Sequence, residues 1–284
     1  MASLLVLISA TLYGIAPILA KIAYASGVTP LTLLALRSTF GAVVVWIGLA
    51  ATRRAVPRGR VRLLLALGLT ILPAQVFGYF YALAVLPAST ASVIANTSPV
   101  HVAWMSRIFL RESLQAADVA ILVAVVSGAA LIAGQTPQFG HALGAVALAV
   151  TTLGAAAYLV AQRRLVRDIH PLGVLAVLLP ASAAVYWGAG LASGQIGLAM
   201  PPSGQLAVAA STVSGAAASL CVLAALRTIP ATRTALLGML EPVVAVVCSV
   251  VLLGDQMSGW RAAGIVVVLS GITLLQTRRI ARAA

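Results

Sequence analysis

Long apolar runs separated by short polar clusters make up almost the whole chain. Residues 63–106, 119–162 and 169–226 contain no Asp, Glu, Lys or Arg. The first two runs are each 44 residues long, enough for two membrane-crossing helices of about 20 residues with a tight turn between them. Because unpaired backbone groups cannot face lipid, we expect each apolar run to be helical.

Windows of about 20 residues predict ten transmembrane helices, and therefore an all-α integral membrane protein. The predicted spans are residues 2–22, 31–51, 63–84, 87–107, 117–134, 141–162, 171–190, 205–226, 232–253 and 260–277. The composition supports this prediction, because 62% of the residues are hydrophobic, only 8% are charged and the mean hydropathy is +1.09. Soluble domains carry roughly 25% charged residues, so a water-soluble fold of this size could not cover so much apolar surface.

The net charge of +13 comes from short clusters of basic residues between the apolar runs. These clusters form no continuous basic face with interleaved aromatic residues, which argues against nucleic-acid binding. If the N-terminus is inside, fifteen of the 18 basic residues fall on that same side. Only Lys21 and Arg261 fall on the opposite side, and Arg37 lies within a span. Because Lys and Arg collect in cytoplasmic loops, we expect a cell (inner) membrane protein with both termini in the cytoplasm.

The two halves of the chain match each other. At a shift of 143 positions, residues 82–131 align with residues 225–274 without a gap. The informative matches are Pro87 with Pro230, Pro99 with Pro242, Glu112 with Asp255, and Ser127-Gly128 with Ser270-Gly271. We therefore predict two five-helix repeats, residues 1–137 and 138–284. Because five is odd, the second repeat enters the membrane from the opposite face, an inverted arrangement typical of secondary transporters with a binding site near the midplane. The alternative is a duplication retained only for structure.

Over essentially its whole length, the chain resembles the EamA-type carriers of the drug/metabolite transporter superfamily. The resemblance rests on ten short spans in two repeats, Ala35-Leu36-Arg37, Pro87 opening the fourth span, and the span ends Leu110-Arg111-Glu112 and Leu253-Gly254-Asp255. The acid that ends the second of these motifs is Asp255, whereas the family more often has Glu at this position. The resemblance implies a central cavity surrounded by the first, third, fourth, sixth, eighth and ninth helices. It also implies export or exchange of amino acids, metabolites or drugs.

Two charged residues are predicted inside spans. Glu241 lies about ten residues into the ninth span, at a depth of roughly 15 Å, where a charge costs several kcal/mol unless it is paired, protonated or hydrated. It could couple protons, pair with a substrate amine or serve a structural role. Arg37 lies one to two turns inside the second span; its long side chain could reach back to the interface, pair with a carboxylate such as Glu241, or bind a substrate carboxylate.

Polar and aromatic residues on the predicted cavity helices complete the candidate set: Tyr13, Gln75, Tyr79, Asn96, His101 and Tyr158. His101 could relay a proton or simply be hydrogen-bonded. Asn96 could bond the backbone opened by Pro99. The tyrosines and Gln75 would suit a solute with an apolar body and a few polar atoms, although helix packing alone also explains each of them. Phe80, Ser211, Thr212 and Ser214 are weaker candidates.

No catalytic or phosphate-binding motif accompanies these residues, and five acids in the whole chain leave few ligands for a metal. We therefore predict a secondary carrier without cofactor or metal, not an enzyme, with a small solute and the bilayer as partners and protons as a candidate coupling ion. Two other classes stay open at this point. One is an intramembrane enzyme acting on a lipid or isoprenoid, and the other is a membrane protein without transport activity.

Overall fold

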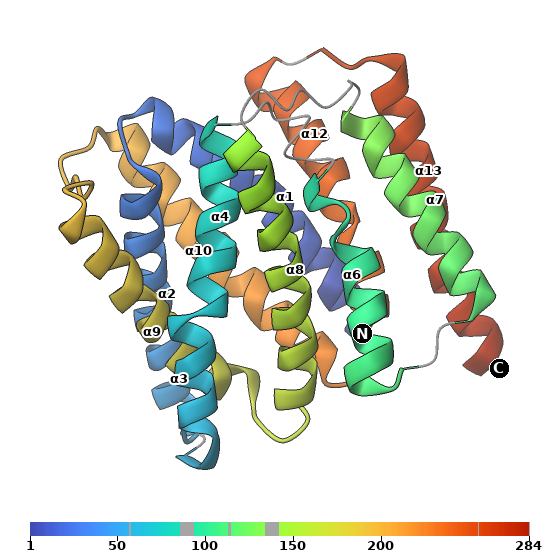
Figure 1. The fold of residues 1–284 in the computed structure, drawn as a ribbon, viewed down its shortest axis with the longest axis horizontal. Coiled ribbons are helices and arrows are strands. Elements are labelled where there is room, and N and C mark those ends of the chain that lie inside the picture. The colour runs from blue at the N-terminus through green and yellow to red at the C-terminus, as the bar shows by residue number, and fades with distance from the viewer. Residues whose placement is uncertain (57, 86–93, 113–114, 134–141, 255, 284) are drawn as a thin grey trace.

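The computed structural model describes residues 1–56, 58–85, 94–112, 115–133, 142–254 and 256–283, which form a bundle of helices joined by loops (Figure 1). The helices are α1 Ala2–Ala25, α2 Pro30–Ala51, α3 Val61–Leu69, α4 Ile71–Val85, α6 Ser98–Met105, α7 Ala116–Ala133, α8 Ala142–Leu165, α9 Pro171–Ala192, α10 Pro202–Leu226, α11 Ala231–Gly238, α12 Leu240–Leu253 and α13 Gly259–Ala283. A short 3-10 turn at Arg58–Arg60 precedes α3, and a π-helical turn at Ser106–Leu110 follows α6. Both chain termini lie at the same end of the bundle (Figure 1).

The described residues contain eight helical stretches that are long and apolar enough to cross a membrane, and a shorter apolar helix at Ala116–Ile132. The predicted all-helical membrane fold is confirmed at this level. The count of ten stays a prediction, because the span predicted at 87–107 begins outside the described residues.

The outer surface of the bundle is apolar. On α2, for example, Phe40, Val43, Val44 and Ile47 are each about half exposed or more, at the three- and four-residue spacing of one helix face. A continuous apolar stripe of this kind is unfavourable in water and suits the hydrocarbon of a bilayer.

Two predicted continuous helices are interrupted. The span expected at 63–84 breaks at Thr70 between α3 and α4, and the span expected at 232–253 breaks at Met239 between α11 and α12. Pro73 and Pro242 explain both breaks, because each proline lacks the N–H that would bond the carbonyl four residues earlier, at the last residue of the preceding half-helix. Each pair of half-helices still makes up one of the stretches that are long and apolar enough to cross a membrane.

Local backbone geometry recurs at the shift of 143 found in the sequence. Asn96 and Thr97 interrupt the helix just before α6, and Met239 occupies the position equivalent to Asn96. Arg111, with φ of 55°, ends the fourth span in the left-handed conformation, and Gly254, with φ of 72°, ends the equivalent α12 in the same way. The Pro87 and Asp255 members of the sequence match lie outside the described residues.

Packing between α7 and α13 follows the same relation. A Cβ added at Gly128 would lie 2.9 Å from Cγ2 of Val268, and one added at Gly271 would lie 2.5 Å from Cγ2 of Val125. The two glycines are 143 residues apart, and so are the two valines. Each half therefore packs an equivalent valine against an equivalent glycine of the other half. A larger residue in place of either glycine would push the two helices apart.

The remaining contacts between the halves are also reciprocal. Helix α1 packs on α10 and α12, and α8 packs correspondingly on α4 and α6; likewise α3 packs on α9, and α10 packs on α2. Figure 1 shows that corresponding helices, such as α1 and α8, run in opposite directions. This arrangement places the facing surfaces of both halves around one central space.

Candidate functional site

A cavity of about 390 Å³ lies where the two halves meet. Its lining comes from α1, α2, α4, α8, α9, α10 and α12, with Ala95 and Ser98 contributed from the fourth span. These include the six helices that the family resemblance implied, and α2 and α9, the second and seventh spans, are additional. Among the described residues, no group of three or more His, Cys, Asp or Glu side chains could hold a metal ion.

Six of the eight predicted site residues line this cavity: Tyr13, Arg37, Gln75, Tyr79, Tyr158 and Glu241. The other two, Asn96 and His101, are partly buried but are not part of the lining, which in their segment consists of Ala95 and Ser98. In the part of the chain that the structure describes, the buried Nδ1 of His101 has no hydrogen-bond partner. The structure therefore brings the tyrosines and both charged residues together and leaves the fourth-span pair aside.

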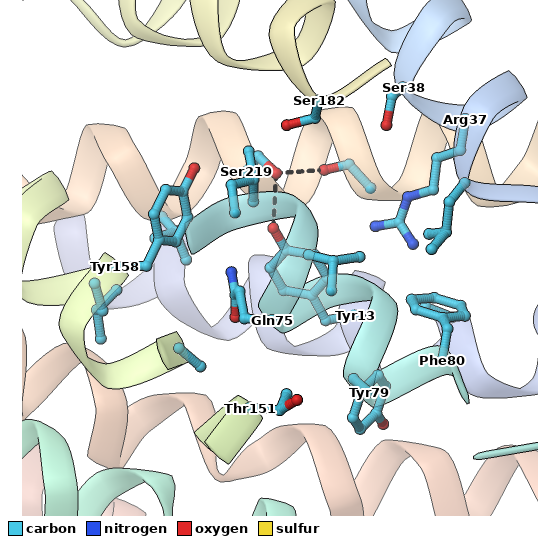
Figure 2. Close-up of a pocket in the computed structure, with 18 of the residues that line it drawn as sticks. Tyr13, Arg37, Ser38, Gln75, Tyr79, Phe80, Thr151, Tyr158, Ser182 and Ser219 are labelled. Atoms are coloured by element: carbon cyan, nitrogen blue, oxygen red, sulfur yellow. Dashed lines mark hydrogen bonds between the residues drawn. The ribbon is translucent and has the colours of Figure 1, made fainter. Parts of the chain in front are cut away.

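Arg37 points from α2 into the cavity and not back to the end of its helix (Figure 2). Its guanidinium lies over the ring of Phe80, with Cζ 5.5 Å from the ring centroid, a cation–π distance. Among the described residues, its buried Nη1 has no hydrogen-bond partner. Within the described part of the chain, the ion pairs join Arg60 to Asp168 and Arg163 to Glu112, and none joins Arg37 to Glu241.

Glu241 occupies the first turn of α12, directly after the break at Met239. A carboxylate is favoured there, because the unpaired N–H groups at a helix N-terminus carry partial positive charge. Ser98 is its counterpart at the shift of 143, and both residues line the cavity. Equivalent positions of the two halves therefore present a carboxylate on one side and a hydroxyl on the other.

Tyr13 is held in place by a short hydrogen-bond chain. Its hydroxyl lies 2.7 Å from Oγ of Ser219, and Ser219 in turn donates to the carbonyl of Gly215 at 2.8 Å (Figure 2). Because a serine hydroxyl has one hydrogen to donate, Tyr13 must be the donor to Ser219. On the opposite wall, Tyr79 and Phe80 pack edge to face with centroids 5.7 Å apart.

A second polar cluster, Glu112 with Arg163, lies outside the cavity lining, with Arg163 in the last turn of α8. Nε of Arg163 is 3.6 Å from Oε1 of Glu112, and the two side chains are only 12% and 13% exposed. Arg163 also donates through Nη1 to the carbonyl of Leu226, and the N–H of Ala231 donates to Glu112 at 3.3 Å. The cluster thus joins the ends of α8 and α10 to the start of α11.

The family model for EamA-like transporters matches residues 1–134 and again residues 142–277. The chain belongs to the EamA-like transporter family. This confirms the resemblance seen in the sequence. Because this is a family of transporters, the intramembrane-enzyme alternative is set aside.

Curated relatives and a solved structure are also similar to this chain. The Pseudopaline exporter CntI, in Pseudomonas aeruginosa strains UCBPP-PA14 and PAO1, is 32% identical over 140 residues. The match covers 47% of this chain and 47% of each relative, so the chain spans about half the length of the curated relatives it matches. A crystal structure that is 23% identical superimposes over 96% of both chains with a TM-score of 0.83, which shows a shared fold.

Several polar residues of this EamA cavity were missed in the sequence: Ser38, Thr151, Thr152, Gln162, Ser182 and Ser219. Helical spacing could have found some of them. Thr151 and Gln162 lie seven before and four after Tyr158 on α8, and Ser219 lies seven after Thr212 on α10. Of the weaker candidates, Thr212 and Ser214 bond their own helix, as expected for hydroxyls in an apolar span.

Proposed function

We propose that the protein is a secondary transporter that exports or exchanges small metabolites, such as amino acids or amphiphilic drugs, by alternating access. The observation that carries this proposal is a cavity shared by both halves that contains one arginine and one glutamate not paired with each other. Such a cavity can hold a solute with an apolar body and polar ends. The exporter among the matched relatives supports export as the direction.

The working unit in this proposal is a ten-helix bundle of two inverted five-helix repeats, residues 1–137 and 138–284. Support comes from the reciprocal glycine–valine contacts, the equivalent helix breaks and the opposite directions of corresponding helices. In an inverted repeat, the two halves can exchange conformations, so that a midplane site opens first to one side of the membrane and then to the other.

We place both termini in the cytoplasm of a cell whose cytoplasmic (inner) membrane holds the protein. The basis is the excess of basic residues on the side of the N-terminus, together with the position of both termini at one end of the bundle (Figure 1). The Glu112–Arg163 cluster then lies at the cytoplasmic end and joins helices that also line the cavity.

Glu241 is the proposed coupling residue. It is the carboxylate of the cavity lining, and a carboxylate in an apolar bundle is costly unless it is protonated or paired with a cation. It can therefore bind a proton when the cavity is empty and a solute ammonium when the cavity is loaded. Either event changes the charge that must cross the membrane.

The test compares Glu241→Gln with the unchanged protein in proteoliposomes. We expect the substitution to abolish uptake driven by a pH gradient while counterflow exchange of a labelled amino-acid panel continues, because glutamine can bind solute but cannot gain or lose a proton. Asp168→Asn is the matched control, since this carboxylate is 68% exposed and outside the cavity. Unchanged pH-driven uptake in Glu241→Gln would refute proton coupling, and absence of counterflow in the unchanged protein would favour a membrane protein without transport activity.

A further inference from the structure

Arg37 has hydrogen-bonding capacity that the protein leaves unused. Its Nη1 is buried without a partner, and within the described part of the chain no carboxylate forms an ion pair with it. An unpaired buried charge costs several kcal/mol, so a protein retains one mainly where another molecule supplies the missing partner.

The polar groups around Arg37 are already bonded elsewhere. Three tyrosines lie within electrostatic range of the guanidinium, together with Glu241. Tyr13 donates to Ser219, Tyr24 donates to the carbonyl of Phe80 at 3.5 Å, and Tyr186 donates to the carbonyl of Pro73 at 3.3 Å. Among the described residues none of these hydroxyls is bonded to the guanidinium, and Glu241, the carboxylate within range, forms no ion pair with it, so an anionic group of a solute in the cavity can supply the missing partner.

The guanidinium is also held in one orientation. The ring of Phe80 lies against one side of it, and the backbone of α10 lies against another. A Cβ added at Gly215 would be only 2.4 Å from Nη2 and 2.7 Å from Cζ, so only glycine leaves room for the arginine here. Figure 2 shows the nitrogens pointing toward the middle of the cavity. A guanidinium fixed in this way presents its planar fork, which matches the two oxygens of a carboxylate.

We propose that Arg37 binds the carboxylate of the transported solute, and that the substrates are small carboxylic acids with an apolar body. This inference rests on the proposed transport function and assigns the solute its chemistry. The apolar part of the solute lies against side chains such as Leu34, Leu72 and Val76. Glu241, which is unpaired with Arg37, remains available for an ammonium group on the same molecule, so amino acids satisfy both charges.

The first experiment measures binding to the purified full-length protein by calorimetry. Three probes share one apolar body: leucine, 4-methylpentanoate, which lacks the amine, and leucinamide, which lacks the carboxylate. We expect the two carboxylates to bind at least about tenfold more tightly than leucinamide, because a charge-assisted pair contributes roughly 1.5–3 kcal/mol. Arg37→Gln should remove this difference, and Arg37→Lys should restore part of it, since lysine keeps the charge and lacks the fork.

Gly215→Ala provides a variant that leaves every charge in place. The added methyl group displaces the guanidinium, which can move because it is the end of a flexible side chain, so the protein should fold normally and bind both carboxylates more weakly. Arg60→Gln is the matched control, because this arginine is half exposed and outside the cavity, and its binding profile should equal that of the unchanged protein.

The outcomes separate this inference from the transport function. Equal affinity for leucine and leucinamide, or no binding of either carboxylate, overturns the carboxylate site. In counterflow, exchange of leucinamide as fast as leucine keeps the carrier and rejects the role of Arg37. Arg37-dependent binding without any exchange across vesicles keeps the site and rejects the carrier. If Arg37 only balances the charge of Glu241, Arg37→Lys will behave as the unchanged protein with all three probes.

Discussion

Two arginines of this protein are both partly buried and differ in what surrounds their charge. Arg163, near the end of α8, has the carboxylate of Glu112 and the carbonyl of Leu226 beside it. Arg37, within α2, has an aromatic ring beside it, and no carboxylate in the described part of the chain forms an ion pair with it. The ion pair of Arg163 with Glu112 links α8, the end of α10, the start of α11 and the segment that follows the π-helical turn. The guanidinium of Arg37 instead faces the cavity. The surroundings of a charge, and not the residue type, thus distinguish a structural group from a binding group.

The largest change in the free energy of unfolding is expected when the ion pair of Arg163 with Glu112 is broken. Arg163→Met leaves Glu112 as a mostly buried carboxylate without a cation, so the free energy of unfolding should fall by about 3 kcal/mol. Chemical denaturation of the purified protein in detergent micelles measures this change. The double variant Arg163→Met/Glu112→Gln should recover at least half of the loss, because it removes the unpaired charge as well. An unchanged unfolding midpoint in Arg163→Met would contradict the structural role.

Substitution of Arg37 is expected to change the free energy of unfolding in the opposite direction. Arg37→Met removes a cation that forms no ion pair within the described part of the chain and replaces it with an unbranched apolar chain, so the free energy of unfolding should rise by about 1 kcal/mol. Denaturation under the same conditions checks the sign, and counterflow exchange of carboxylate solutes should be lost in the same sample. A destabilisation as large as that of Arg163→Met would mean that Arg37 also holds the fold together.

The smallest effect is expected at an exposed pair. Arg60 and Asp168 are 3.4 Å apart and their side chains are 49% and 68% exposed, so water already solvates both charges. Arg60→Met should change the free energy of unfolding by less than about 0.5 kcal/mol and should leave exchange unaffected. A large loss here would show that an ion pair can matter in this bundle without burial, and the contrast between Arg163 and Arg37 would lose its basis.

The sequence was sufficient for the features that depend on hydrophobicity over long runs. Charge-free runs predicted the helices, and the cost of a buried carboxylate placed Glu241 at an interior surface, where the structure has it. Asn96 and His101 lie on a predicted cavity helix but are not part of the cavity lining. The helix is interrupted at Asn96 and Thr97, just before Pro99. The residues before and after this break therefore do not share one helical periodicity. For this reason helical spacing cannot predict which side of the segment faces the cavity.

Contacts between distant segments could not be predicted from the sequence either. Whether Arg37 reaches out to the interface or into the cavity depends on the space left by Gly215 on another helix. The pairing of Glu112 with Arg163 depends on where two span ends meet, and neither residue carries a local signal for the other. In both cases the deciding quantity is a distance across the bundle.

Ser98 and Glu241 stand at matched positions in the two halves, and only one of them ionises. A perfectly duplicated carrier would have two access states of equal energy, because exchanging the halves converts one state into the other. A single acid at one of the two positions lifts that degeneracy. In the proposed carrier, a proton gradient acts through the half that carries Glu241, so protonation changes the energy of one access state relative to the other.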